Sequence, residues 1–345
     1  MPRTWNPAAE QVDSGFHREK FKNMKSSRIA FAALLSLAAA PFVALAQYPD
    51  RPLRMIVPYA AGGPGDTLAR QISPRLAEFL GQPIVIDNRP GAGAILGTEA
   101  AAKAVPDGYT LYLSTDGPIS INPSLYAKLP YDPVRDFAPV TLLASARQVL
   151  AVNPSVAAAS VPELIALLRA QPGKLNYASF GSGSLGHLAA EMFKSLTGTD
   201  ITHIPFKGTP QALQALIAGD VQVMFVGEPA ALAHSKSGRL RALASSGPRR
   251  STLFPDIPTL AEAGVTGYDV QGLFGLMLPA GAPGEIIARL NAEAARVLAA
   301  PDVQARMRAV GFEPQPSTPQ AFAALVASEI AKWAKVVRAS GAKPD

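Results

Sequence analysis

The sequence predicts an α/β protein with two lobes, in which mostly parallel sheets carry helices on their faces and a cleft separates the lobes. The first observation is that strand-like and helix-like segments alternate twice along the chain, an order that builds parallel sheets covered by helices. The second is the length of 345 residues, of which 48% are hydrophobic, because such a chain has enough material for two domains. Cysteine is absent, which excludes disulfides, thiolate metal sites and a Cys nucleophile.

Residues 1–46 are predicted to be a leader that the mature protein lacks. A basic segment that starts at Met24 precedes an apolar, Ala/Leu-rich run at residues 29–43, and Ala44-Leu45-Ala46 matches the small-residue cleavage pattern. These three parts indicate a bacterial secretory signal peptide from Met24 to Ala46, preceded by a polar extension. The apolar run is short for a membrane span and contains Pro41, which disfavours a retained transmembrane helix. We therefore expect export to the periplasm.

The charge of the chain argues against a nucleic-acid partner. The full sequence carries a formal net charge of +6, and removal of residues 1–46 lowers it to +3. No basic run with interleaved aromatic residues is present, so nucleic-acid binding has little support. The small net positive charge is compatible with the binding of small anions.

The first lobe is predicted to comprise residues 47–147 and 270–345. Its expected strands are at 53–59, 83–88, 109–114 and 269–278, and its expected helices are at 67–80, 95–104, 283–300, 301–310 and 318–340. Residues 122–136 are expected to be irregular. Two β-prone runs within residues 137–152 are interpreted as the chain leaving the first sheet.

The second lobe is predicted from residues 148–269. Its expected helices are at 161–170, 184–196, 210–218 and 229–236, and its expected strands are at 175–179, 202–206, 221–226 and 240–244. Two lobes of this kind place the carboxyl ends of their strands along the cleft, where α/β sheets bind ligands.

Two Gly-rich loops are predicted to face each other across this cleft. One, at residues 59–66, follows the first strand, and the other, at residues 179–187, joins a strand to a helix. Free backbone N–H groups and a helix N-terminus attract carboxylates and phosphates. Gly181 to Gly186 also matches G-x-G-x-x-G, but the next strand ends without the acidic residue that a dinucleotide site needs. A tight turn without a ligand is the remaining alternative for this loop.

Four side chains near these loops each have a structural and a binding interpretation. Asp66 either caps the following helix through the N–H of Leu68 or Ala69 or belongs to the site. His187 packs or caps within its helix, or faces the cleft. Lys207 is either a solvated lysine or an anion contact. Glu228 caps the helix that it opens, where a carboxylate interacts favourably with the helix dipole, and contact with the cleft is the minority interpretation.

The chain shows no reaction machinery. It lacks a nucleophile elbow, opposed carboxylates and any His cluster at metal-ligand spacing. We therefore expect no enzyme activity, no catalytic residue, no metal site and no cofactor.

Six stretches together resemble the Bug-type (TctC-like) substrate-binding proteins of tripartite tricarboxylate transporters. They are residues 48–70, 88–111, 121–144, 175–193, 203–225 and 237–264. The resemblance implies a two-lobed periplasmic binding protein fold of type II-like form. It also implies a protein that closes on a small carboxylate-bearing solute and delivers it to membrane permease subunits of such a transporter. A monomer is expected.

The resemblance and the residues together define the expected substrate-binding set. In the family, ligand carboxylates meet the first-lobe and second-lobe loops, and the end of the 109–114 strand and the Lys207-Gly208 turn complete the cleft. The expected residues are Tyr59, Ala61, Gly62, Gly63, Asp66, Ser114, Thr115, Ser179, Gly181, Gly183, Ser184, His187, Lys207 and Glu228.

One segment departs from the family pattern. Family members usually carry an Asp directly after the strand that here ends in Met224-Phe225, whereas this chain continues Val226-Gly227-Glu228-Pro229. We expect that Glu228 partly replaces this Asp, or that the ligand lacks a cationic group. Two other functions stay open at this point: an α/β enzyme that binds a dinucleotide at Gly181 to Gly186, and a ligand sensor for a membrane signalling partner.

Overall fold

The computed structural model describes residues 1–2 and 48–344. The chain divides into two units, Met1–Gln47 and Tyr48–Asp345, and every helix and strand given below lies in the second unit. The predicted signal peptide lies outside the described residues. In the described part of the chain, no helix has the length and apolar character that a membrane crossing requires.

The first sheet begins with three parallel strands in the order β2-β1-β3. Their connections are the helices α2 and α3, as the alternating pattern predicts. The bounds are β1 Leu53–Val57, α2 Pro64–Leu80, β2 Ile84–Asn88, α3 Ile95–Ala102 and β3 Thr110–Thr115. Helix α2 starts at a Pro, whose fixed φ suits the first turn, and ends at Gly81 in the left-handed region with φ 78°.

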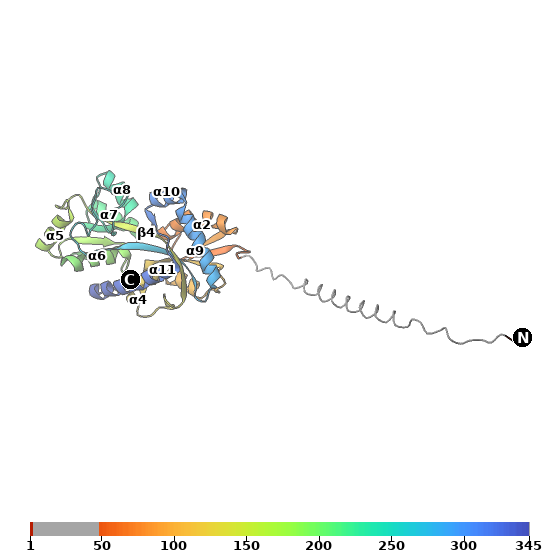
Figure 1. Ribbon diagram of the computed structural model, residues 1–345. Coiled ribbons are helices and arrows are strands. Elements are labelled where there is room, and N and C mark those ends of the chain that lie inside the picture. The colour runs from red at the N-terminus through yellow and green to blue at the C-terminus, as the bar shows by residue number, and fades with distance from the viewer. Residues whose placement is uncertain (3–47, 345) are drawn as a thin grey trace. The chain divides into compact units, whose positions relative to one another are not determined.

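Strand β4, Phe137–Val152, connects the two sheets as one strand of 16 residues. Its residues up to Arg147 pair with β9, Gln271–Pro279, whereas its residues from Gln148 onward pair with β7, Val223–Gly227. The two β-prone runs of the sequence are therefore one continuous strand. Figure 1 shows β4 passing from the helices α2, α9 and α10 to the helices α6, α7 and α8.

The second sheet repeats the alternation of strands and helices. Its strands β7, β5 and β6 are parallel to one another, and β8 pairs with β4 on the other side. The bounds are α5 Val161–Ala170, β5 Asn176–Ser179, α6 Leu185–Thr197, β6 Thr202–Pro205, α7 Thr209–Ala218, α8 Glu228–Lys236 and β8 Arg241–Ser245.

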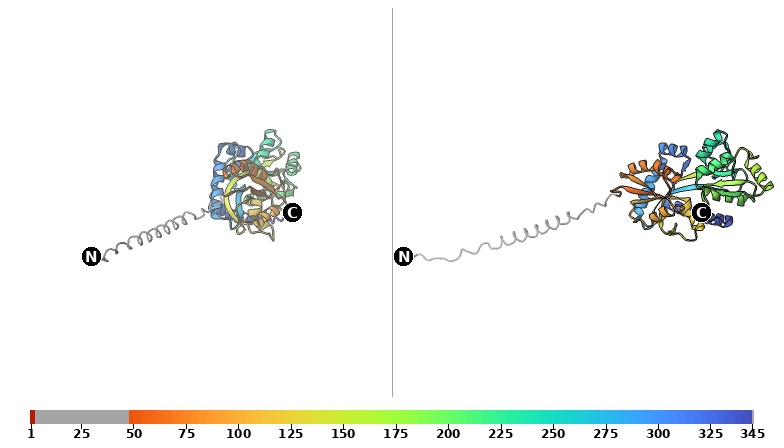
Figure 2. Two further views of the ribbon diagram at one scale, coloured as in Figure 1. Left: turned by 90° about the vertical axis from the view of Figure 1, so that its right-hand side faces the viewer. Right: turned by 180° about the vertical axis from the view of Figure 1, so that it is seen from behind.

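The C-terminal elements return to the first sheet and then cover both sheets. They are α9 Gly284–Ala299, α10 Pro301–Ala309, β10 Phe312–Pro314 and α11 Pro319–Ser340. Phe322 near the start of α11 packs with Tyr112 of the first sheet, whereas Trp333 near its end packs in the same core as Leu188 of α6. Figure 2 shows the blue C-terminal segments beside both the orange and the green parts of the molecule. The lobe boundaries stay a prediction.

Three features differ from the sequence prediction. Gly117–Ile121 forms a π-helix, η1, for which no element was predicted, and the short helix α4, Asn122–Leu125, follows it at the start of the segment expected to be irregular. The short strand β10 was not predicted, because three residues carry no periodicity. The sheets are mixed rather than mostly parallel, since all pairings of β4 and β9 are antiparallel.

Candidate functional site

Strand directions place the candidate site where the two sheets meet. Strands β1 and β3 are parallel, and both run in the direction of β4, because β9 is antiparallel to β3 and to β4. Strand β4 continues into the second sheet, where β7 runs against it and β5 and β6 follow β7. The carboxyl ends of β1 and β3 therefore point toward the second sheet, and those of β5, β6 and β7 point toward the first. Both Gly-rich loops follow these ends.

Asp66 holds the first loop in shape. Its buried carboxylate accepts hydrogen bonds through Oδ2 from the backbone N–H of Gly62 at 2.8 Å and from Nε of Arg70 at 2.9 Å. The hydrogen bond from Arg70 is the main cause that lowers the pKa of Asp66. The expectation that Asp66 caps the helix through Leu68 or Ala69 is wrong, because the N-cap of α2 is Gly63 and has no side-chain acceptor. Asp66 bends back to the loop instead.

Tyr59 and the end of β3 lie beside this loop. About a third of Tyr59 is exposed (36%), yet burial of its hydroxyl near Asp116 raises its pKa to about 12. Ser114 and Thr115 are the last residues of β3 and are buried. Ala61 and Gly62 are exposed and Gly63 is half-buried, so the loop tip is accessible. The structure thus brings the predicted residues of the first loop and of β3 to one place.

The second loop is held by its own side chains. The hydroxyl of Ser179 donates to the carbonyl of Gly181 at 3.0 Å and accepts from the Gly181 N–H at 3.3 Å. The Gly183 N–H donates to Nδ1 of His187 at 2.9 Å, and the His187 N–H donates to Oγ of Ser184, the N-cap of α6. His187 is buried, with 6% of its surface exposed. It therefore organises the loop from within, as the packing interpretation expects.

The aromatic rings of His187, His203 and Tyr177 stack on one another beside the second loop. The imidazoles of His187 and His203 are parallel within 6°, with centroids 3.9 Å apart, and Tyr177 stacks on His203 at 4.8 Å. Nε2 of His203 lies 2.7 Å from Oγ of Ser179. Because that hydroxyl donates its one hydrogen to Gly181, the tautomer consistent with this geometry has His203 Nε2–H as the donor.

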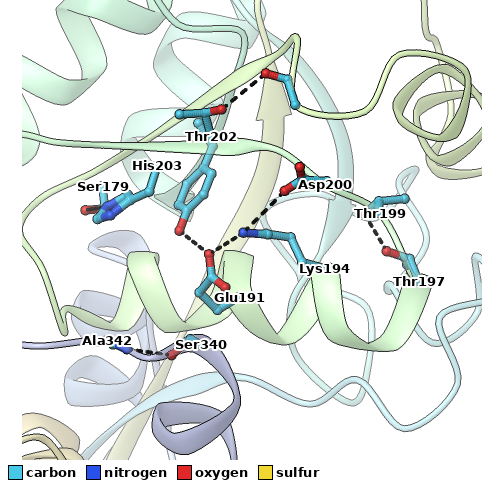
Figure 3. Close-up of polar contacts among 12 residues, drawn as sticks. Ser179, Glu191, Lys194, Thr197, Thr199, Asp200, Thr202, His203, Ser340 and Ala342 are labelled. Carbon is cyan, nitrogen blue, oxygen red and sulfur yellow. Dashed lines mark hydrogen bonds and ion pairs between the residues drawn. The ribbon is translucent and has the colours of Figure 1, made fainter.

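At Tyr177 the stack connects to three charged side chains, Glu191, Lys194 and Asp200, which Figure 3 shows. The Tyr177 hydroxyl donates to Glu191 at 2.7 Å, Lys194 donates to the same carboxylate oxygen at 2.9 Å, and Asp200 lies 3.9 Å from Lys194. This chain of contacts links α6 to the turn before β6. It fixes the strand and helix on either side of the loop, so the loop is positioned before any ligand arrives.

Backbone hydrogen bonds within the loops reduce the number of N–H groups that remain available to bind an anion. The N–H groups of Gly62, Gly63, Gly181, Gly183 and Ser184 all have intramolecular acceptors. The first turns of α2 and α6 supply others, because N–H groups at the start of a helix have no acceptor within the helix. The first turns of α2 and α6 are therefore where backbone N–H groups without an intrahelical acceptor remain beside the two loops.

Lys207 and Glu228 lie at the ends of the remaining strands. Lys207 is exposed after β6. Glu228 starts α8 but is 2% exposed, and it accepts from the hydroxyls of Ser245 at 3.2 Å and Ser251 at 2.7 Å. Burial raises its pKa, opposed by these serines and by Arg147. Glu228 is thus a buried acceptor that points to β8 and its following loop.

The segment that joins β3 to β4 contacts the second loop, a contact that the sequence analysis missed. A Cβ built on Gly183 would lie 3.2 Å from Cδ1 of Leu125 and closer still to Cδ2. A Cβ on Gly93 would lie 2.6 Å from the Tyr126 hydroxyl. A Cβ on Gly117 of η1 would lie 2.7 Å from the hydroxyl of Tyr59, so η1 lies beside the first predicted loop and Leu125 of α4 beside the second. The sequence feature that could have indicated this contact was the presence of apolar residues within a Pro-rich segment.

A buried polar group at the centre of β4 was also missed. Ser145 Oγ, Arg147 Nε and Gln148 Oε1 are buried without a hydrogen-bond partner in the described part of the chain, as is Oε1 of Gln271, which lies opposite Arg147 on β9. The sequence feature that could have indicated these buried polar groups was an Arg and a Gln within an otherwise apolar strand. Among the described residues, no group of His, Asp and Glu side chains has the arrangement of a metal site.

Comparison with known proteins gives a consistent result. Residues 68–342 match the model of the tripartite tricarboxylate transporter family receptor, TctC. The protein BugT of Bordetella pertussis is 40% identical over 306 residues, which is 88% of this chain and 94% of BugT.

Solved structures agree with these sequence matches. An R. palustris protein with adipate is 37% identical, with a TM-score of 0.77 over 86% of this chain and 100% of that chain. MatC from Rhodopseudomonas palustris, with bound malate, is 35% identical, with a TM-score of 0.71 over 84% and 100%. The fold is therefore the α/β fold of periplasmic binding proteins. The family consists of transporter receptors rather than enzymes, and this chain belongs to it: it is a member of the TctC family of tripartite tricarboxylate transporter receptors.

Proposed function

We propose that the protein captures a small carboxylate-bearing solute between two lobes in the periplasm and delivers it to the membrane subunits of a tripartite tricarboxylate-type transporter. The observation that carries this proposal is the opposition of the two helix N-termini, α2 and α6, across the junction at β4. Each offers N–H groups and a positive dipole end, a combination that favours a carboxylate.

Capture follows from differential binding to open and closed forms. A ligand that contacts only one loop binds both forms equally and shifts nothing, whereas a ligand that contacts both favours the closed form. Charge-assisted hydrogen bonds from N–H groups to carboxylate oxygens are short and directional, so they suit this task. The relatives solved with adipate and with malate support a carboxylate as the ligand class.

A thermal-shift screen of the mature protein, residues 47–345, tests the ligand class. We expect one or more mono-, di- or tricarboxylates to raise the melting temperature in proportion to the logarithm of concentration, because a ligand of the native state stabilises it by mass action. Titration calorimetry then gives the stoichiometry, with one site per chain expected. Saturable binding of NAD(P) with no carboxylate response would show that the Gly181 to Gly186 loop holds a dinucleotide instead.

Export and delivery have separate tests. Expression of the full chain with periplasmic extraction should yield a protein whose N-terminus is Gln47, read by intact mass. Uptake of the labelled ligand into cells should require both this chain and the transporter's membrane subunits. Uptake that persists when this chain is deleted would contradict the delivery step.

A further inference from the structure

Arg147 is a buried arginine that has no hydrogen-bond or ion-pair partner among the described residues. Only 8% of its surface is exposed, and it occupies the residue of β4 at which pairing changes from the first sheet to the second. Its Nε is buried without a hydrogen bond, and in the described residues its guanidinium has neither a hydrogen-bond nor an ion-pair partner. The buried Glu228 carboxylate interacts electrostatically with Arg147, which lowers the pKa of Glu228, but its oxygens accept hydrogen bonds from Ser245 and Ser251 instead.

Such an arrangement does not stabilise the fold. An arginine Nε–H removed from water without an acceptor loses its hydration and gains no hydrogen bond in return, and buried charges in proteins are usually paired. The other buried ionised side chain of the site, Asp66, follows this rule through Arg70. The N–H donors of Arg147 that have no acceptor among the described residues are free to bind an acceptor from outside the chain.

The surroundings of Arg147 hold the side chain in one position. A Cβ built on Gly247 would lie 2.8 Å from both Cδ and Nε of Arg147, so the arginine stem lies flat on the Gly247 backbone. Gly247 has no positive φ, so the close approach rather than the backbone requires glycine here. Gln271 faces Arg147 across the β4–β9 ladder, and its Oε1 has no donor in the described residues.

We propose that Arg147 binds a carboxylate of the transported solute and determines its specificity. This inference rests on the proposed function and adds a second anchor to it. One carboxylate binds at the helix N-termini, and a second one reaches the guanidinium at the sheet junction, where planar carboxylates fit the guanidinium fork. The solute is then a dianion.

The test compares Arg147→Gln with the wild type on matched ligand pairs. The probes are the straight-chain dicarboxylates from malonate to adipate and their monoamides, measured by calorimetry. Loss of a charge-assisted hydrogen bond to a carboxylate should weaken the diacid by about 10–100-fold. The monoamide should bind the wild type weakly and change little in the variant, because it lacks the second charge.

Two further variants separate charge from position. Arg135→Gln removes the same charge at a side chain that is 81% exposed on the loop before β4, and it should leave diacid affinity unchanged. Gly247→Ala keeps the arginine but displaces its stem, and it should weaken the diacid by at least several-fold. Unliganded Arg147→Met should melt at the wild-type temperature or above it, because no hydrogen bond or ion pair among the described residues is lost.

The outcomes distinguish this inference from the proposed function. If the wild type binds no carboxylate, the proposed function fails. If the wild type binds diacids but Arg147→Gln weakens diacid and monoamide equally, or neither, the assignment of Arg147 is wrong. A lower melting temperature in both Arg147→Gln and Arg147→Met also overturns it, since the arginine then serves the fold.

Discussion

Gly183 should tolerate no side chain, and the structure gives the size of the effect. Its φ of 73° lies in the left-handed region, which costs an alanine roughly 1–2 kcal/mol. The new Cβ would also press on both methyl groups of Leu125, and overpacking of this kind costs about 1–3 kcal/mol. We expect Gly183→Ala to lower the free energy of unfolding by about 2–5 kcal/mol, measured by urea denaturation with linear extrapolation.

The chain offers a matched control for this variant. Gly198 ends the same helix, α6, with φ 63°, and a Cβ there meets nothing within 4 Å. Gly198→Ala therefore reports backbone strain alone and should cost about 1 kcal/mol. The double variant Gly183→Ala with Leu125→Ala should recover the overpacking part, because the cycle isolates the contact between the two residues. Equal costs for Gly183→Ala and Gly198→Ala, or no recovery in the double variant, would refute the contact.

Three further predictions concern charges. The pKa of Asp116 is raised to about 7, first by burial and also by Glu329, so the contribution of its protonated form to stability is full below about pH 4 and is lost as pH rises through 7. Between pH 4 and 8 the free energy of unfolding of Asp116→Asn should therefore fall less than that of the wild type, by on the order of 4 kcal/mol. Parallel pH curves for the two proteins would contradict this. Asp66→Asn should destabilise the protein by about 1–2 kcal/mol and weaken carboxylate binding, because the bond from Gly62 loses its charge; unchanged urea midpoint and unchanged affinity would exclude this role. Glu228→Gln should reduce the affinity for acidic amino acids more than that for dicarboxylates, because only the former carry an ammonium group; equal losses in calorimetry would rule out Glu228 as a substitute for the family's Asp.

Much of the fold follows from local patterns in the sequence. Helix α6 begins at Leu185 and ends before Gly198, close to the predicted range, because Ser184 caps it and its apolar residues repeat with helical spacing. The loops after β1 and β5 are equally local, since their glycines permit conformations that other residues avoid. Local signals of this kind were enough to predict both loops and the residues within them.

The partners of the loop residues were not visible in the sequence. Asp66 had a plausible cap within its own helix, yet its carboxylate bonds backward to Gly62, because the loop folds over the helix start. His203, 16 residues beyond His187, stacks on it only because β5 and β6 pair in parallel beside α6. Helix periodicity and turn chemistry report on neighbours in sequence, and these contacts join elements that are neighbours only in space.

The sequence by itself determined the α/β alternation, the two Gly-rich loops and the membership of a receptor family, because each depends on residues close together in the chain. Only the tertiary structure decided that β4 runs unbroken through both sheets and that its centre carries Arg147, whose buried Nε has no hydrogen-bond acceptor in the described part of the chain. In sequence, Arg147 is one polar residue in an apolar strand, and nothing local distinguishes it from an exposed arginine. Burial and the absence of an acceptor are properties of everything packed around a side chain, which no single stretch of sequence contains.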